Sequence, residues 1–160
     1  MSTTSAGTVE HRLAAGGMVL PEVAPPVSNY IPARRLHDLV FCAGVTSEGA
    51  TGTVGVDATV EDARGAARVA ALRALAYLQQ QIGSLDQVHG VMRLTGYVSC
   101  GPGFTGTPQV IDAASDVLIA AFGERGRHAR SAVGVSSLPG GALVEVELIV
   151  ALESVASDDR

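Results

Sequence analysis

The segment from Leu143 to Leu152 alternates between apolar and other residues, and this alternation limits the possible folds more than any other feature. Successive side chains of a β-strand point to opposite faces of its sheet. One face therefore carries Val144, Val146, Leu148 and Val150, and the other carries Glu145 and Glu147 with Ile149 and Ala151. The pattern predicts a sheet that packed elements cover on one face only.

Two predicted helices can cover that face. Thr59 can cap the first, in which apolar residues recur at steps of three and four until Gly83 ends it. The second starts at Thr107 as its cap, has Pro108 in its first turn and stops at Gly123. Strands are expected over 29–35, 39–44, 88–98, 129–136 and 143–152. This order predicts an α+β fold, with a mixed sheet and both helices packed on one face.

The 160 residues fit one domain of ordinary size. Residues 1–26 are small, polar and proline-bearing, so we expect an N-terminal arm that allows a helical turn around Val9 to Ala15. Residues 27–153 then form the single domain, and residues 154–160 are expected to be a flexible tail.

Composition argues against several kinds of partner. Hydrophobic residues make up 47% of the chain and the mean hydropathy is +0.30, yet no apolar run approaches the roughly 18 residues of a membrane span. We therefore expect no membrane partner, and we assign the surplus apolar surface to contacts between subunits. The net charge of −5, the lack of tryptophan and the scattered basic residues argue against a nucleic-acid partner.

The remaining compositional signals concern location and metals. The N-terminus lacks the basic start and apolar stretch of a secretory signal, so we expect a cytoplasmic protein. Cys42 and Cys100 have no CxxC or Cys/His spacing, which favours free thiols over a disulfide or a zinc site. No His, Asp and Glu cluster has metal-ligand spacing, and no metal is expected.

Arg130 and Glu145 are the strongest candidates for a functional site. The two C-terminal strands are joined by a short Pro-Gly-Gly turn, which predicts that both side chains lie in register on the uncovered face. A guanidinium holds a carboxylate through two parallel hydrogen bonds. A desolvated glutamate has a raised pKa that suits acid–base chemistry. The alternative is a structural ion pair of Arg130 with Glu145 or Glu147.

Two further residues are weaker candidates. His128 precedes Arg130 by two positions and so shares its face of the strand, although a histidine at a strand start also occurs as a polar edge residue. Tyr30 either contacts a ligand through its hydroxyl or packs in the core.

The stretch from Ala129-Arg130-Ser131-Ala132-Val133 through Leu138-Pro139 to Val144-Glu145-Val146 resembles the signature of the RidA family, also called YjgF or L-PSP. The likeness extends over roughly residues 29–152. It implies a trimer with a chorismate-mutase-like fold, which hydrolyses an enamine or imine to a 2-keto acid and ammonia without a metal or organic cofactor. The resemblance assigns carboxylate binding to Arg130, positioning of the attacking water to Glu145, and the lining of a pocket between subunits to Tyr30 and Gly44.

The chain departs from the usual family pattern in the pocket walls. His128-Ala129-Arg130 stands where the family usually has Pro-Ala-Arg, and Ala132 stands where a cysteine is common. With Pro102-Gly103-Phe104 and Ser115-Asp116, these residues resemble a longer branch of the family. We place Ala132, His128 and Phe104 with Arg130, Tyr30 and Gly44 among the substrate-binding residues, and Glu145 as the catalytic residue.

Three functions follow as hypotheses. The leading one is a homotrimeric deaminase of small 2-imino or enamino acids. The main alternative is a non-catalytic trimer that binds a small carboxylate metabolite through Arg130. An endoribonuclease is the third, and the acidic composition and the lack of an aromatic stacking platform disfavour it.

Overall fold

A computed structural model describes residues 7–154 and contains one β-sheet. Its helices are α1 (Val9–Ala15), α2 (Val60–Ile82) and α3 (Thr107–Phe122). Its strands are β1 (Ala33–Leu36), β2 (Leu39–Cys42), β3 (Val45–Thr46), β4 (Val88–Ser99), β5 (Ala129–Val135) and β6 (Val144–Leu152). Three single-turn 3₁₀ helices, η1 (Leu85–Gln87), η2 (Gly123–Gly126) and η3 (Pro139–Gly141), lie between them.

The sheet has the strand order β1-β2-β6-β4-β5, and β3 pairs with β6 beyond the end of β2. The β4–β5 pair is parallel, and every other named pair in the described residues is antiparallel. A parallel neighbour needs a crossover connection, which α3 provides between β4 and β5. The sheet is therefore mixed, as the sequence predicted.

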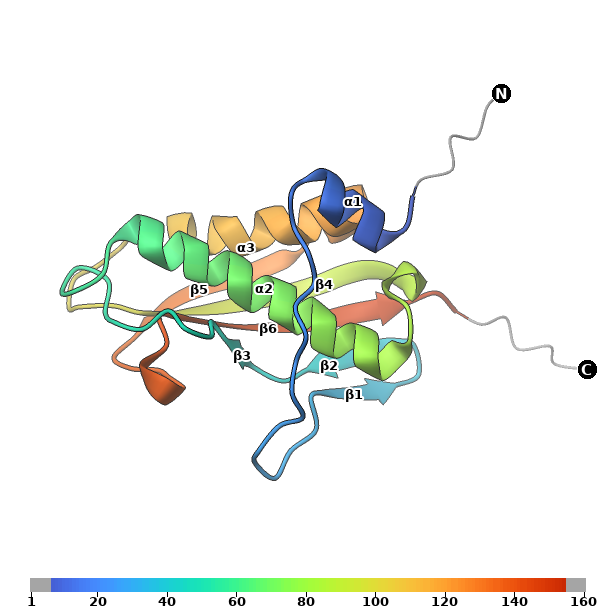
Figure 1. The fold of residues 1–160 in the computed structure, drawn as a ribbon, viewed down its shortest axis with the longest axis horizontal. Helices are drawn as coiled ribbons and strands as arrows, with labels where there is room; N and C mark the ends of the chain where they lie inside the picture. The colour runs from blue at the N-terminus through green and yellow to red at the C-terminus, as the bar shows by residue number, and fades with distance from the viewer. Residues whose placement is uncertain (1–6, 155–160) are drawn as a thin grey trace, which may run out of the picture.

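Both long helices pack on the same face of the sheet, and α1 lies against α3 (Figure 1). Thr59 caps α2, because its hydroxyl accepts from the Asp62 N–H while the Asp62 carboxylate accepts from the Thr59 N–H. The helix buries a run of alanines and two leucines, which keeps its axis close to the sheet. The predicted α+β class with two helices on one face is confirmed.

The alternation of β6 holds in the structure. Val144, Val146, Leu148 and Val150 are at most 1% exposed and lie under the helices. The opposite face of the sheet, which we call the open face, carries Glu145 and Glu147. Leu39, Phe41 and Val133 are exposed there, each at about 40%.

Two local expectations were wrong. The first strand begins at Ala33 rather than at residue 29; Pro32 precedes it and has no N–H to donate to a ladder. The two C-terminal strands do not pair as a hairpin, because β4 lies between β5 and β6. The long β4 pairs with both of them along most of its length.

Residues 9–26 lie along the helices of the domain. Val9 and Leu13 of α1 are buried, and Arg12 donates from Nε to the carbonyl of Ala121 in α3 at 2.7 Å. Tyr77 of α2 donates its hydroxyl to the Ala24 carbonyl at 2.7 Å. Of the expected tail 154–160, residues 155–160 lie outside the described part of the chain. Within residues 7–154, no helix combines the length and apolar character that a membrane crossing requires.

Candidate functional site

Glu145 lies on the open face of β6 and lines a cavity of about 550 Å³. Tyr30 and Gly44 line the same cavity, so the structure brings together three of the predicted site residues. The cavity lies at the interruption between β2 and β3, where β6 loses its partner strand for two residues. Burial raises the pKa of the Glu145 carboxyl, and the nearby Glu147 charge raises it further. The group is therefore a better proton acceptor than an ordinary glutamate.

Gly44 has a steric role beside Glu145. A Cβ atom at position 44 would lie 2.0 Å from Oε1 of Glu145, far inside van der Waals contact. The carboxyl group therefore occupies the space that any larger residue would fill. The absence of a side chain at position 44 allows the carboxyl group to lie against the backbone.

Arg73 is a cavity residue that the sequence reasoning missed. It reaches from α2 to the Thr46 carbonyl, to which it donates from Nη1, and its Nη2 lies 3.3 Å from Glu48. Its Nε is buried and makes no hydrogen bond within residues 7–154. Tyr77, one helical turn later, lines the same cavity. The i, i+4 spacing of these two long polar side chains was the available signal.

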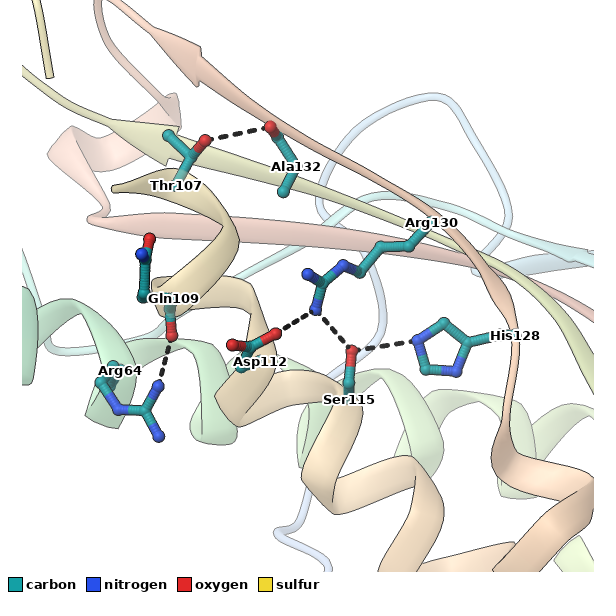
Figure 2. Close-up of polar contacts among 8 residues, drawn as sticks. All are labelled: Arg64, Thr107, Gln109, Asp112, Ser115, His128, Arg130 and Ala132. Atoms are coloured by element: carbon teal, nitrogen blue, oxygen red, sulfur yellow. Dashed lines mark hydrogen bonds and ion pairs between the residues drawn. The ribbon is translucent and has the colours of Figure 1, made fainter. Parts of the chain in front are cut away.

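Arg130 does not lie beside Glu145, which corrects the expectation that both side chains share the uncovered face in register. Arg130 pairs with Leu94 across the ladder, whereas Glu145 pairs with Tyr97. The Arg130 side chain turns to the helix side of β5, where Nη1 donates to Asp112 Oδ1 at 2.7 Å and to Ser115 Oγ at 3.1 Å (Figure 2). Its structural ion pair is thus with Asp112 of α3, not with Glu145 or Glu147.

Small residues explain why β5 turns Arg130, rather than its valines, toward the helices. Ala132 and Gly134 share a face with Arg130, and this face packs under the start of α3. A Cβ atom at position 134 would lie 2.7 Å from the Cys100 sulfur, so the helix side has no room for the valines. Val133 and Val135 therefore point to the open face.

His128 lies beside Arg130, as its spacing predicted. Its Nε2 is 3.0 Å from Ser115 Oγ (Figure 2), and its Nδ1 is 2.5 Å from the carbonyl oxygen of Gly126. Burial lowers the pKa of the imidazole, and the Arg130 charge lowers it further, against the opposing effect of the Gly126 carbonyl. A cavity of about 170 Å³ adjoins the group, lined by Ser115, Ile119, Arg127, His128 and Arg130.

The two remaining predicted residues lie elsewhere. Phe104 lines a separate cavity near the end of β5, together with Cys100 and Gly134. Ala132 is partly buried under α3, and its carbonyl accepts a 3.0 Å hydrogen bond from the Thr107 hydroxyl. The predicted site residues of one chain are thus divided: Tyr30, Gly44 and Glu145 share one cavity, His128 and Arg130 share another, and Phe104 and Ala132 line neither.

The two cysteines form no disulfide in the described residues. Cys42 and Cys100 are both free thiols, and burial raises the pKa of Cys42 to about 12. Such a thiol stays protonated and unreactive at neutral pH. Among residues 7–154, no group of three or more His, Cys, Asp or Glu side chains is arranged to hold a metal ion.

The fold and the site residues define a class of small α+β proteins with a one-sided mixed sheet. Residues 10–152 match the family described as YjgF/chorismate mutase-like, putative endoribonuclease, and the chain belongs to this family. It is 37% identical to Protein TCP17 of Trypanosoma cruzi, over 96% of this chain and 100% of that protein.

Solved structures agree with this membership. The protein Atu1372 of unknown function from Agrobacterium tumefaciens is 35% identical, with a TM-score of 0.84 over 91% of this chain and 94% of that one. A putative endoribonuclease from Shewanella oneidensis MR-1 is 34% identical, with a TM-score of 0.87 over 91% and 100%. RidA from a Psychrobacter species, at 23% identity and a TM-score of 0.55 over 81% and 94%, shares the fold.

Proposed function

We propose that the protein is an enamine/imine deaminase, which hydrolyses small 2-imino or enamino acids to 2-keto acids and ammonia. The observation that carries the proposal is the position of Glu145. Its half-buried carboxyl lies beside Gly44 and Tyr30 in a cavity of substrate size. A carboxyl group of raised pKa in a cavity is what proton transfer to and from water requires.

The reaction needs few groups, because an imine carbon is already electrophilic. Glu145 accepts a proton from water as the water oxygen bonds to that carbon and the C=N π electrons move to nitrogen. The carboxylic acid then returns the proton to nitrogen. Glu145 then carries the hydroxyl proton to the amino nitrogen, the carbonyl re-forms as the C–N bond breaks, and ammonia leaves with the keto acid as the second product. Positioning of water and substrate supplies most of the rate.

Arg130 is the proposed anchor of the substrate carboxylate, and it reaches Glu145 only through a second copy of the chain. Within one chain the two residues lie on opposite faces of the sheet. Nη1 of Arg130 is engaged by Asp112 and Ser115, and the rest of the guanidinium faces the small cavity. We therefore propose a homotrimer, in which the Arg130 group of one subunit meets the Glu145 cavity of the next. The apolar residues of the open face support such an assembly.

Ammonia release from 2-aminoacrylate generated in situ tests the proposal. We expect Arg130→Ala to abolish acceleration and Glu145→Gln to slow it by about 10²-fold or more. Arg68→Ala and Glu22→Gln change a partly exposed and an exposed residue outside the cavities, and serve as controls that keep full activity. The absence of acceleration by the wild-type protein across several imino acids would contradict deaminase activity.

A different outcome would indicate a binding protein. In that case a small carboxylate would raise the melting temperature of the wild type and of Glu145→Gln but not of Arg130→Ala, with no turnover. The description of the Shewanella relative as a putative endoribonuclease makes RNA cleavage a third outcome to measure. Cleavage that persists through purification and is lost in Glu145→Gln would favour it over deamination.

A further inference from the structure

We propose that Ser115 and His128 form a nucleophile–base pair that takes an acyl group from small esters. This activity does not use Glu145, although it shares Arg130 with the proposed imine hydrolysis. It rests on the hydrogen bonds of Ser115 to His128 and to the guanidinium of Arg130 (Figure 2). It rests also on the hydrogen bond between His128 and the Gly126 carbonyl, and on the cavity that Ser115, His128 and Arg130 border.

The Ser115 hydroxyl is directed away from its own helix. Ser115 lies in the middle of α3, where a serine hydroxyl commonly bonds to the carbonyl four residues earlier. Here Oγ instead lies 3.0 Å from Nε2 of His128 and 3.1 Å from Nη1 of Arg130. The oxygen thus faces a base on one side and a cation on the other.

The backbone fixes the tautomer of His128. The Gly126 carbonyl oxygen can only accept, so the hydrogen of the ring lies on Nδ1, which donates to it at 2.5 Å. Nε2 is then the acceptor and receives the hydrogen of the Ser115 hydroxyl. In serine hydrolases a carboxylate usually orients the histidine. In this chain the carbonyl of η2 has that role.

The charges around the pair favour a neutral imidazole and a stabilised alkoxide. Burial and Arg130 lower the pKa of His128, which leaves the ring ready to accept a proton at neutral pH. The charged side chains of the group are Arg127, which is paired with Glu124, Arg130 on the strand side, and Asp112 on α3. Asp112 holds Arg130 at 2.7 Å and fixes the guanidinium next to Ser115 Oγ. When Oγ bonds to the ester carbon, negative charge develops on the carbonyl oxygen, which the same guanidinium would stabilise.

The adjoining cavity limits the acyl group. Its volume of about 170 Å³ is below the roughly 300–1,000 Å³ of pockets for drug-sized ligands. Arg127 and Arg130 both line it, and Arg127 bonds Glu124 through Nε while Arg130 bonds Asp112 through Nη1. Their other N–H groups favour a short acyl chain that ends in an anionic group as the substrate class. Ile119 adds an apolar wall for the chain itself.

The chemistry follows the two steps of covalent catalysis. In acylation, Ser115 Oγ bonds to the ester carbon, the bond from that carbon to the alcohol oxygen breaks, and the Ser115 proton passes through His128 Nε2 to the departing alcohol. In deacylation, water bonds to the acyl carbon and gives its proton to His128. The carbon–Oγ bond then breaks, and the proton returns to Ser115 as the free acid leaves.

Mass spectrometry of the full chain after reaction with a small fluorophosphonate tests the proposal directly. We expect one adduct, mapped to Ser115, and a burst of p-nitrophenol from p-nitrophenyl acetate. Ser115→Ala should lose both signals, and His128→Gln should slow labelling by about 10²-fold or more. The matched control is Ser131→Ala on the same strand edge, where the hydroxyl faces Arg93 on the open face; it should label like the wild type.

Two additional measurements separate a reactive serine from a structural one. Labelling of Ser115→Cys by iodoacetamide should remain dependent on His128, and the wild-type labelling rate should stay constant until the pH falls below the usual imidazole range. An adduct on another serine, no adduct at all on folded wild-type protein, or equal rates with Gln and His at position 128 would overturn the proposal.

Discussion

Gly44 shows how one missing side chain determines the chemistry of this cavity. Its Cα lies so close to the Glu145 carboxyl that the site cannot accept even a methyl group without moving the proposed catalytic residue. The glycine is therefore required by its neighbour rather than by a turn, since its backbone does not lie in the left-handed region.

We expect Gly44→Ala to lower deaminase activity toward the level of Glu145→Gln, because the new Cβ displaces the carboxyl group. Ammonia release measures this effect, and circular dichroism checks that the protein stays folded. The control is Gly65→Ala in α2, where an added Cβ meets no atom within 4 Å. That change should retain activity and raise stability by about 0.5–1 kcal/mol. Full activity in Gly44→Ala would show that Glu145 need not lie where the structure has it.

The raised pKa of Glu145 also predicts a pH-dependent stability. The folded state disfavours the ionised carboxylate, so stability from this group is complete below the ordinary carboxyl pKa and is lost as the pH rises through the raised value. Glu145→Gln removes this loss. Thermal unfolding should therefore show the variant as more stable than the wild type at pH 7, with the difference disappearing at low pH. A wild type that is more stable than Glu145→Gln at pH 7 would contradict the raised pKa of Glu145.

At the scale of elements, the start of α2 has a stabilising feature that the sequence already indicated. The reciprocal bonds between Thr59 and Asp62 satisfy two N–H groups at the helix start and lower the pKa of Asp62. The side-chain bond between the two residues is 2.6 Å long. This cap defines where the longest helix begins.

We expect Thr59→Ala to destabilise the protein by about 0.5–2 kcal/mol, the range measured for loss of an N-cap. Urea unfolding gives the free energy, and the contribution should diminish in acid as Asp62 becomes protonated. Thr105→Ala, an exposed position in the loop before α3, provides the comparison and should change stability little. Equal stabilities of the two variants would mean that the cap contributes nothing.

Periodicity predicted where the helices and strands lie in the sequence far better than how each strand is oriented against its neighbours. The caps and glycines placed both long helices within a residue or two, and the alternation of β6 identified its buried valines. The orientation of β5 could not be read the same way. An edge strand under a close helix buries Ala132 and Gly134 instead of its valines, so hydrophobicity pointed to the wrong face.

The sequence suggested candidate site residues but not how they are arranged. Strand alternation suggested Glu145, and the family likeness added Gly44 beside Tyr30; these three residues share a cavity. Two-residue spacing placed His128 with Arg130. The sequence did not show that β4 separates the two groups, because strand order depends on long-range pairing that no local pattern records. Arg73 and Ser115 were missed as site residues for a related reason: each reaches its partners from a helix distant in sequence.

At the scale of the whole molecule, the separation of Arg130 from Glu145 makes a prediction about subunits. If each active site takes Arg130 from one copy and Glu145 from the next, two inactive variants should complement each other. We expect co-expressed Arg130→Ala and Glu145→Gln chains to recover about a quarter of the active sites by random mixing in a ring. Ammonia release from the copurified hybrid measures the recovery.

The control for complementation is the mixture of separately purified homotrimers before any exchange, which should remain inactive. A hybrid without activity would contradict a shared site.

The same proposed assembly predicts that Phe41→Glu on the open face dissociates the trimer. Light scattering would measure this as a fall in molecular mass. Val69→Glu, at a similarly exposed position on α2, should leave the oligomer intact.

The central position of β6 has a consequence for how the chain reaches its folded state. This last strand of the described chain pairs with β2, β3 and β4, so the N-terminal hairpin and the β4–α3–β5 unit share no ladder until it arrives. During synthesis on the ribosome, neither half can complete the sheet before residues 144–152 have emerged. The sheet is therefore complete only once β6 has been added, and a chain cut short before β6 exposes the edges of β2 and β4 to aggregation.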